Sequence, residues 1–221
     1  MIVVDKIKKS YGKKEVLKDI SFTAGDGKCI GILGGNGSGK STLLSILSGV
    51  TSKDNGSFLC DDTDLFKDAK KRSELVGYVP QGTPLIEELS CRDNLLLWYE
   101  KEEMEKSLSS GVLNMLGIND FLSVPVNKMS GGMKKRLSIG CAVCDNPRIL
   151  LLDEPSAALD IVCKERIFKY VKDFTKNGGI VIISTHDTWE LSILDELYIL
   201  KDGSLLKYEY DGDIHRLAGM L

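Results

Sequence analysis

Long hydrophobic runs are missing from this sequence of 221 residues. No apolar stretch approaches the roughly 18–20 residues that span a bilayer, so we expect no membrane-spanning helix. The opening stretch Met1–Val4 is too short for the apolar part of a signal peptide, and the acidic Asp5 follows it at once. We therefore expect a cytoplasmic protein that does not insert into a membrane and that reaches one only through another polypeptide.

An excess of basic charge is also missing. The chain carries 29 Lys and Arg against 32 Asp and Glu, a formal net charge of −3. Proteins that bind a nucleic-acid backbone usually carry a basic excess, so we expect no nucleic-acid partner. Hydrophobic residues at 43% and charged residues at 28% are ordinary for a globular protein, and the length suits one core with a smaller lobe. We predict a single domain over residues 1–221.

The cysteines lack the spacing of a zinc site. Cys141 and Cys144 form one Cys-x-x-Cys pair, but a zinc site needs two further ligands, and no second pair or nearby histidine supplies them. We interpret the cysteines as free, partly buried thiols. The six are Cys29, Cys60, Cys91, Cys141, Cys144 and Cys163.

Short apolar runs alternate with helical patterns along most of the chain. Residues 29–33, 76–79, 149–152 and 180–183 form apolar runs of strand length, and a helical pattern over 41–47 follows the first. Continuous apolar runs are typical of strands buried on both faces. Strands separated by helices favour an α/β fold with a parallel sheet.

Two segments break this alternation. Residues 1–28 are rich in strand-forming residues, with turn signals at Gly12 and at Gly25-Asp26-Gly27, and predict an antiparallel β subdomain. Residues from about 84 to 145 have an almost entirely helical pattern, which includes Asn94-Leu95-Leu96-Leu97-Trp98. We predict an α-helical subdomain inserted between two core strands.

A glycine-rich segment lies between the first apolar run and the helical pattern that follows it. It fits Gly-x4-Gly-Lys-Ser, the P-loop or Walker A pattern, in the strand-to-helix context that the pattern requires. Glycines let backbone N–H groups turn around phosphate oxygens, which a bare structural turn would not need. This predicts a P-loop NTPase core that binds ATP through Gly34, Gly35, Asn36, Gly37, Ser38, Gly39, Lys40, Ser41 and Thr42.

An acidic pair follows the apolar run 149–152. Asp153 is delivered to the carboxyl end of a core strand, where it can hold Mg²⁺ together with the Ser41 hydroxyl. Glu154 can orient or deprotonate the attacking water, and general-base help is worth about 10²–10⁴ in rate. The two carboxylates predict hydrolysis, with Lys40 and Glu154 as catalytic residues.

Further motifs resemble those of the ABC ATPase family, in order along nearly the whole chain. Ser130-Gly131-Gly132-Met133 is similar to the family signature, although Met129 and Met133 depart from its usual Leu and Gln. Segment 156–160 (Ser156-Ala157-Ala158-Leu159-Asp160) resembles the D-loop. Three single residues also match the family. The resemblance implies that Tyr11 stacks on adenine, and that Gln81 is the Q-loop residue and ligates Mg²⁺. It implies that His186 is the switch histidine and a third catalytic residue.

The resemblance implies partners as well as residues. It implies a head-to-tail dimer with a second ATPase subunit, in which Ser130, Gly131 and Gly132 of one copy contact the γ-phosphate bound by the other. Closure of this dimer around ATP would drive a separate transmembrane permease, which would hold the chain at the inner face of the cell membrane. The Met-containing signature is similar to that of the drug- and antibiotic-exporter branch, which implies export.

Two other functions fit parts of the same pattern. A soluble ABC ATPase could power a non-membrane assembly machine, and recovery only in soluble complexes would favour it over transport. A nucleotide sensor that does not hydrolyse ATP would not need Lys40, Asp153, Glu154 and His186 together. The presence of all four argues against the sensor.

Overall fold

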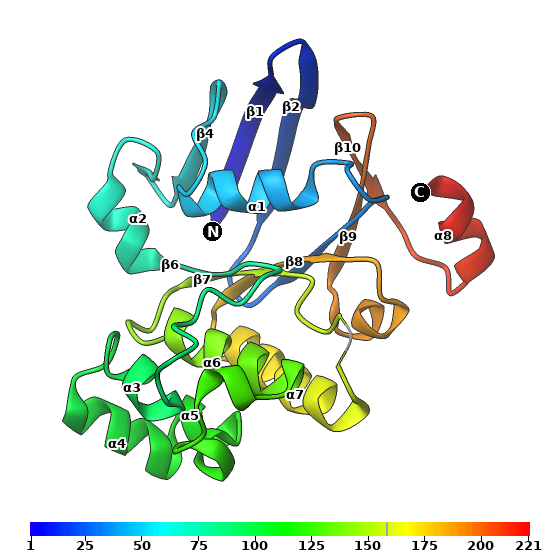
Figure 1. Cartoon of the computed structure of the whole chain (residues 1–221). Helices are drawn as coiled ribbons and strands as arrows, with labels where there is room; N and C mark the ends of the chain where they lie inside the picture. The colour runs from blue at the N-terminus through cyan, green and yellow to red at the C-terminus, as the bar shows by residue number, and fades with distance from the viewer. Residues whose placement is uncertain (158) are drawn as a thin grey trace.

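Two β-sheets with one helix between them form the framework of the protein (Figure 1). The computed structural model describes residues 1–157 and 159–221. In Figure 1 the antiparallel strands lie above α1 (Lys40–Ser48), and the parallel strands lie below it. The remaining large helices cover the lower face of the parallel sheet.

The first sheet is antiparallel, with the order β2-β1-β4-β5. Strand β1 (Ile2–Tyr11) turns directly into β2 (Lys14–Ala24), and Gly12 takes a left-handed φ of 60° at the turn. Pairing of Tyr11 with Lys14 closes this hairpin. Strand β4 (Asn55–Cys60) pairs with β1, and β5 (Thr63–Asp64) pairs with β4; both come from beyond the first 28 residues. The predicted N-terminal antiparallel subdomain is confirmed, and it includes these two additional strands.

The second sheet has the order β10-β9-β3-β8-β7-β6. Neighbouring strands are parallel except β10, which pairs antiparallel with β9. This sheet confirms the predicted parallel core. Its strands are β3 (Cys29–Leu33), β6 (Val76–Val79), β7 (Ile149–Asp153), β8 (Ile180–Thr185), β9 (Glu196–Lys201) and β10 (Ser204–Tyr208).

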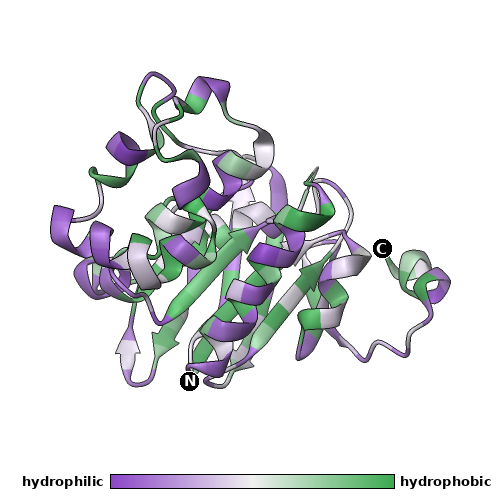
Figure 2. Ribbon diagram, turned by 90° about the horizontal axis from the view of Figure 1, so that it is seen from below, coloured by the Kyte–Doolittle hydropathy of each residue, from purple (hydrophilic) through white to green (hydrophobic). Residues whose placement is uncertain are grey.

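The central strands of this sheet are buried on both faces. Along β7, Ile149 and Leu151 pack into the core that contains α1 and the first sheet. Leu150 and Leu152 alternate with them and pack into the core on the helical side. Figure 2 shows the same division, with hydrophobic residues along the strands and hydrophilic residues on the outer faces of the helices. Burial of both faces explains why these runs have no polar alternation.

More than half of the described helical elements lie between β6 and β7 in the sequence, although these two strands are neighbours in the sheet. This insertion confirms the predicted helical subdomain, while its limits at 84 and 145 stay a prediction. It contains α3 (Cys91–Leu95), α4 (Lys101–Ser110), α5 (Val112–Met115), α6 (Gly131–Ala142) and the 3-10 helices Ile118–Phe121 and Val126–Lys128. The other helical elements are α2 (Ala69–Leu75), α7 (Ile161–Lys176), the 3-10 helix Thr188–Ile193 and α8 (Ile214–Met220).

The helical pattern 94–98 ends earlier than its sequence predicts. Helix α3 stops at Leu95, and the next residues form tight turns, in which Trp98 N–H donates to the Leu95 carbonyl at 2.9 Å. These turns leave Leu96, Leu97 and Trp98 exposed at the surface. Leu95 is buried in the core, but the other hydrophobic residues of this run do not belong to it.

The two residues of the cysteine pair differ in burial. Cys141 is buried near the end of α6, and Cys144 lies just beyond the helix. Burial raises the pKa of Cys141 to about 12, which keeps it protonated. In residues 1–157 and 159–221, no cluster of three or more His, Cys, Asp or Glu side chains could hold a metal ion.

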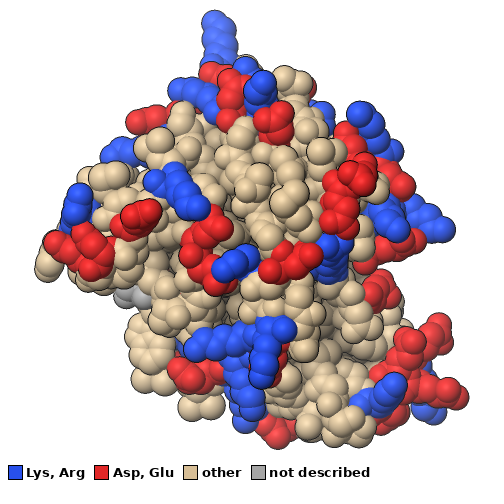
Figure 3. Space-filling model, turned by 180° about the vertical axis from the view of Figure 1, so that it is seen from behind, with Lys and Arg blue, Asp and Glu red and all other residues tan. Residues whose placement is uncertain are grey.

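The surface carries charges of both signs. In the view of Figure 3, acidic and basic side chains lie side by side over much of the face. Across the described ranges, none of the helices combines the length and hydropathy that crossing a bilayer requires.

Candidate functional site

The predicted motifs meet because their strands are neighbours. Strand order β3-β8-β7-β6 places the carboxyl ends of four parallel strands along one edge of the sheet. The sequence-distant segments that follow these strands therefore lie together, as ligand sites do in α/β sheets. The register that aligns their ends pairs Leu33 with Thr185, Ser184 with Asp153, and Leu152 with Val79.

The glycines of the P-loop satisfy specific steric needs. A Cβ on Gly34 would lie 2.4 Å from the Leu200 carbonyl oxygen, so a larger residue cannot fit at the end of β3. Gly37 and Gly39 have φ values of 77° and 109°, which side chains other than glycine rarely adopt. Helix α1 begins at Lys40, directly after Gly39. The loop thus presents backbone N–H groups and a helix N-terminus on one side.

Lys40 is buried beneath this loop, with only 5% of its surface exposed. Its ammonium donates hydrogen bonds to the carbonyls of Gly34 at 2.8 Å and Gly35 at 3.2 Å. Burial lowers the pKa of Lys40, while the charges of Glu154 and Asp153 raise it. The backbone carbonyls therefore hold the ammonium inside the loop, and the charges of the two carboxylates favour its protonated form.

A pocket of about 550 Å³ opens above the loop. This volume is within the range of small-molecule sites. Two lining residues, Lys14 and Val16, were missed by the sequence analysis, because only the fold brings β2 against the loop. The predicted residues that line the pocket are Tyr11, Asn36, Gly37, Gly39, Lys40, Ser41, Thr42, Gln81 and Glu154. Gly35 and Ser38 line an adjoining hollow.

Tyr11 stands at the rim of this pocket. It ends β1, and 52% of its surface is exposed. The ammonium of Lys9 lies 5.1 Å from the centre of its ring. An exposed ring at the mouth of a pocket can stack on a planar base.

Glu154 has an unusual backbone conformation directly after β7. Its φ of 48° is in the left-handed region, which costs a residue with a side chain about 1–3 kcal/mol. Its N–H donates to the carbonyl of Ser184 at 3.0 Å and to the hydroxyl of the same residue at 3.2 Å. These bonds to β8 hold the strained turn and fix the position of the carboxylate.

The Glu154 carboxylate joins two of the other predicted residues. Its Oε2 accepts a hydrogen bond from the Gln81 amide at 2.9 Å. Its Oε1 lies 3.2 Å from Nδ1 of His186, whose side chain is about half exposed. The structure thus gathers a carboxylate, an amide and an imidazole beside the pocket.

Asp153 lies deeper than Glu154 and is 1% exposed. The buried Ser184 hydroxyl donates a hydrogen bond to its Oδ1. Because the same hydroxyl accepts from the Glu154 N–H, Ser184 orients both acidic residues. Ser184 was not predicted from the sequence; a polar residue at the end of a buried strand is the signal that could have identified it.

The segments after β7 and β8 are linked to each other. The Ser156 N–H donates to the buried carboxylate of Glu190 at 3.1 Å, and its hydroxyl donates to Asp187 at 3.3 Å. Lys164 from α7 also pairs with Asp187. Burial raises the pKa of Glu190. Ala158, which the D-loop assignment includes, lies outside the described residues.

The signature segment is separate from this pocket. Ser130 caps α6, and its hydroxyl accepts from the Met133 N–H at 3.3 Å. Ser130 and Gly131 are exposed, and neither is among the described residues that line the pocket above the P-loop. Gly132 is buried, and a Cβ there would lie 2.5 Å from Cys163 Sγ on α7. The structure therefore does not join the signature to the P-loop of its own chain.

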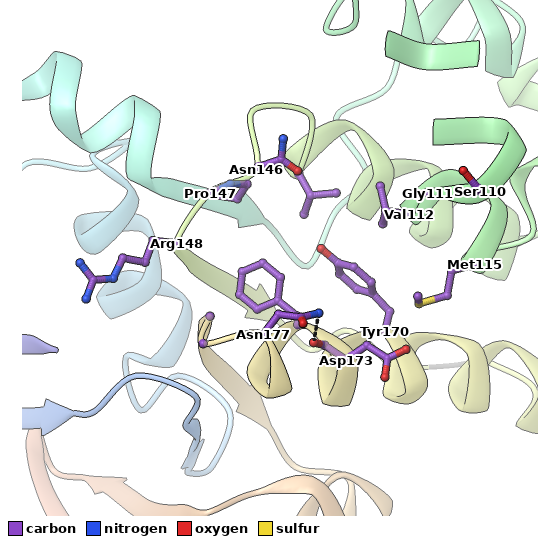
Figure 4. A pocket seen from close by; sticks show the side chains of 14 residues that line it. Ser110, Gly111, Val112, Met115, Asn146, Pro147, Arg148, Tyr170, Asp173 and Asn177 are labelled. Atoms are coloured by element: carbon purple, nitrogen blue, oxygen red, sulfur yellow. Dashed lines mark hydrogen bonds between the residues drawn. The ribbon is translucent and has the colours of Figure 1, made fainter. Parts of the chain in front are cut away.

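A hollow of about 570 Å³ lies at the amino end of β7, away from the P-loop. Figure 4 shows Tyr170 from α7 pointing toward Val112 and the loop of Asn146 and Pro147. None of the predicted site residues is among its described lining residues. Size alone therefore does not identify the functional pocket, since the predicted chemistry gathers at the other one.

Comparisons with known proteins agree with this geometry. A family model described as "ABC transporter" matches residues 17–157. The linearmycin resistance ATP-binding protein LnrL of Bacillus subtilis is 32% identical over 225 residues, covering 99% of this chain and 72% of that protein. The lantibiotic transport ATP-binding protein SrtF of Streptococcus pyogenes is 31% identical over 214 residues, covering 96% and 92%.

Solved structures extend the likeness to three dimensions. A dimeric ATP-binding cassette in a post-hydrolysis state with ADP and phosphate superposes with a TM-score of 0.85 at 28% identity, covering 96% of this chain and all of that one. A nucleotide-free cassette gives 0.87 at 24% identity, covering 99% and 95%, which shows the fold alone. The chain binds and hydrolyses ATP, and it belongs to the ABC transporter family.

Proposed function

We propose that this chain is the ATPase subunit of an exporter and drives a separate transmembrane permease by closing as a head-to-tail dimer around ATP. One observation carries the proposal: the residues for binding and hydrolysis gather at one pocket, while the exposed signature end of α6 lies apart from it. A second copy can supply the missing anion contact.

In this proposal the P-loop binds the phosphates of ATP. The backbone N–H groups of the loop and the start of α1 provide the anion site, and Tyr11 stacks on the adenine. Lys40 exchanges its bonds to the Gly34 and Gly35 carbonyls for bonds to phosphate oxygens. Release of these internal bonds lets the loop respond to the presence of nucleotide.

The oxygen-rich side chains beside the loop fit Mg²⁺. A hydroxyl, an amide oxygen and a carboxylate are hard ligands of the kind this ion prefers. Ser41, Gln81 and Asp153 would hold the ion, with Ser184 orienting Asp153. Bound Mg²⁺ would neutralise charge on the phosphates.

Hydrolysis depends on Glu154 in this proposal. Its carboxylate orients a water molecule and accepts a proton from it as the water attacks the γ-phosphorus; the bond from that phosphorus to the β,γ-bridging oxygen breaks, and ADP and phosphate are released. His186, which contacts the same carboxylate, donates a hydrogen bond to the γ-phosphate as charge develops. The hydrogen bonds from the Glu154 N–H to Ser184 keep this base in place.

An apolar patch on the helical subdomain suits the permease. We call Ile86, Leu96, Leu97 and Trp98 the lobe patch; each is at least 42% exposed. The Asn94 side chain bonds both backbone groups of Ile86, and the Leu97 N–H bonds the Asn94 carbonyl, so the two segments that carry the patch are held close together. Exposed apolar clusters of this kind mark protein contacts.

Export is favoured by the relatives. LnrL is named for linearmycin resistance, SrtF for lantibiotic transport, and a protein of Sinorhizobium fredii, 32% identical over 208 residues, for Nod factor export. That last match covers 91% of this chain and 60% of the relative. We therefore assign the permease complex to outward transport.

Mixed dimers test the composite site. Lys40→Ala removes the phosphate lysine from one nucleotide site, and Ser130→Ala removes the signature hydroxyl from the site of the partner. Two chains with different affinity tags allow isolation of the mixed dimer. Pairing a Lys40→Ala chain with a Ser130→Ala chain leaves one site complete, so we expect about half the wild-type rate per dimer if the sites turn over independently. A rate no higher than that of either variant alone would refute completion between subunits.

A further inference from the structure

Lys135 is a buried lysine that none of the predicted roles uses. It lies in the second turn of α6, and 5% of its surface is exposed. Its ammonium donates to the main-chain carbonyls of Pro80 at 3.0 Å and Gln81 at 3.1 Å. A buried charge is costly unless it is paired or hydrogen-bonded, so these contacts restrict where the side chain can lie.

The surroundings of Lys135 connect it to the hydrolytic site. Burial lowers its pKa, while the charges of Asp153, Glu154 and Glu190 raise it. The two carbonyls that it bonds belong to the segment from which the Gln81 amide reaches Glu154. One ammonium therefore holds the segment that contacts the Glu154 carboxylate.

Helix α6 is fixed to this segment at a second point. A Cβ on Gly77 in β6 would lie 2.4 Å from the Ala142 carbonyl at the end of α6, so strand and helix are in close contact there. Strand β6 continues directly into Pro80 and Gln81. Lys135 holds the second turn of the helix to the Gln81 segment. Strand β6, this segment and α6 therefore form one unit, and Ser130 lies at the end of α6 opposite Ala142.

We propose that Lys135 is a positioning residue that makes the Gln81 segment and α6 move together, so that the state of one nucleotide site sets the position of the Ser130 end that completes the other. This inference rests on the proposed composite site. Movement of Gln81 toward or away from Glu154 is passed through two hydrogen bonds to α6. The nucleotide state of each subunit then changes the position of the Ser130 that it supplies to the site of its partner.

Lys134 gives a matched control for Lys135. It is the preceding residue on the same helix, and its ammonium pairs with Glu87 at 3.3 Å on the surface. An exposed pair of this kind contributes about 0–1 kcal/mol, so Lys134→Met should change little. Lys135→Met replaces the lysine with an unbranched apolar side chain of similar length and removes both hydrogen bonds.

The first measurement separates positioning from stability. With Mg·ATP, we expect Lys135→Met to lower kcat by about tenfold or more, as loss of charged hydrogen bonds implies, while affinity for a fluorescent ATP analogue stays within about twofold. Amide exchange of residues 81–83 should accelerate in the nucleotide-free protein. Lys135→Arg, which keeps the charge and the donors, should recover most of the rate. Equal losses of turnover and nucleotide-binding capacity would reduce Lys135 to a structural role and overturn the proposal.

Mixed dimers give the deciding result. A chain with Lys40→Ala and Lys135→Met is paired with an unsubstituted chain, so the competent P-loop and Gln81 lie in the unsubstituted chain and only Ser130 comes from the variant. We expect turnover below that of the matched dimer with Lys40→Ala and Lys134→Met. Equal rates would overturn the proposal. If Lys135→Met does not fold, Lys135→Gln, with a shorter single-amide donor, takes its place under the same criteria. The composite-site proposal fails separately, if the Lys134→Met control dimer has no activity from its one complete site.

Discussion

The Gln81 amide donates a hydrogen bond to Glu154 Oε2 over 2.9 Å, although 73 positions separate the two residues in sequence. Parallel pairing of β6 with β7 makes this contact possible, because both residues follow the carboxyl ends of adjacent strands. Since His186 engages the other carboxylate oxygen, Glu154 is held from two sides. Contacts within the chain therefore position the proposed base.

The first prediction concerns this carboxylate. Glu154→Gln keeps the size of the side chain but removes its charge and its ability to accept a proton. We expect kcat to fall by about 10²–10⁴. ATP binding should persist, because the P-loop contacts are unchanged, and size-exclusion chromatography with ATP should show an accumulated dimer. Hydrolysis at the wild-type rate would remove Glu154 from its proposed role.

Ser184 provides a second prediction. Ser184→Ala removes the hydroxyl that bonds Asp153 and the Glu154 N–H, leaving buried polar groups without this partner. We expect a loss of about 1–3 kcal/mol in the free energy of unfolding, measured by denaturant titration. Turnover should also require more Mg²⁺, because Asp153 is no longer oriented.

Ser192 supplies the control for that change. Its exposed hydroxyl donates only to the Trp189 carbonyl among its described contacts. Ser192→Ala should stay within about 0.5 kcal/mol of the unsubstituted protein. If both alanine variants have the same stability and the same Mg²⁺ dependence, Ser184 does not orient the acidic pair.

Local sequence signals predict much of the fold. The apolar runs that become β7 and β8 are buried on both faces, and a continuous apolar run is the pattern that such burial requires. The P-loop is similarly local, since strand, glycines and helix are contiguous. A single segment contains all the information in these cases.

Relations between distant segments were harder to predict. The order β3-β8-β7-β6 decides that Gln81, Glu154 and His186 meet, and it depends on the packing of the whole chain. Family resemblance, rather than pattern, indicated this meeting. The left-handed φ of Glu154 and the contact of Lys135 with the Gln81 carbonyl have no local sequence signal. Both are imposed by tertiary contacts.

Replacement of the two signature glycines by alanine should change the free energy of unfolding by different amounts. A Cβ on Gly132 would lie 2.5 Å from Cys163 Sγ, whereas a Cβ on Gly131 meets no atom within 4 Å. Gly132→Ala should therefore lower the free energy of unfolding by about 1–3 kcal/mol through overpacking. Gly131→Ala should be neutral or stabilising by up to about 1 kcal/mol, because alanine favours helix.

Cys163→Ala tests the cause of that difference. It removes the sulfur that the new methyl group meets, so the double variant with Gly132→Ala should recover part of the lost stability relative to the sum of the single changes. Thermal or denaturant unfolding of the four proteins completes the cycle. Strictly additive effects would mean that contact with Cys163 does not explain the intolerance of position 132.

The lobe patch leads to the last prediction, on association with the permease. Trp98 is 60% exposed, and its neighbour Leu97 is also in the patch, so replacing both by serine removes apolar area without opening a cavity in the core. Aromatic residues often dominate binding energy at interfaces, where truncation costs about 2 kcal/mol or more. We expect Leu97→Ser with Trp98→Ser to lower co-purification with the permease in detergent by tenfold or more, the factor to which about 1.4 kcal/mol corresponds.

Val50, which is 75% exposed just after α1, gives a control outside the helical subdomain. If Val50→Ser reduces co-purification as much as the double change does, the lobe patch is not the docking surface. Circular dichroism of each variant shows whether the fold is retained, so a loss of binding in a folded double variant is assigned to the patch itself.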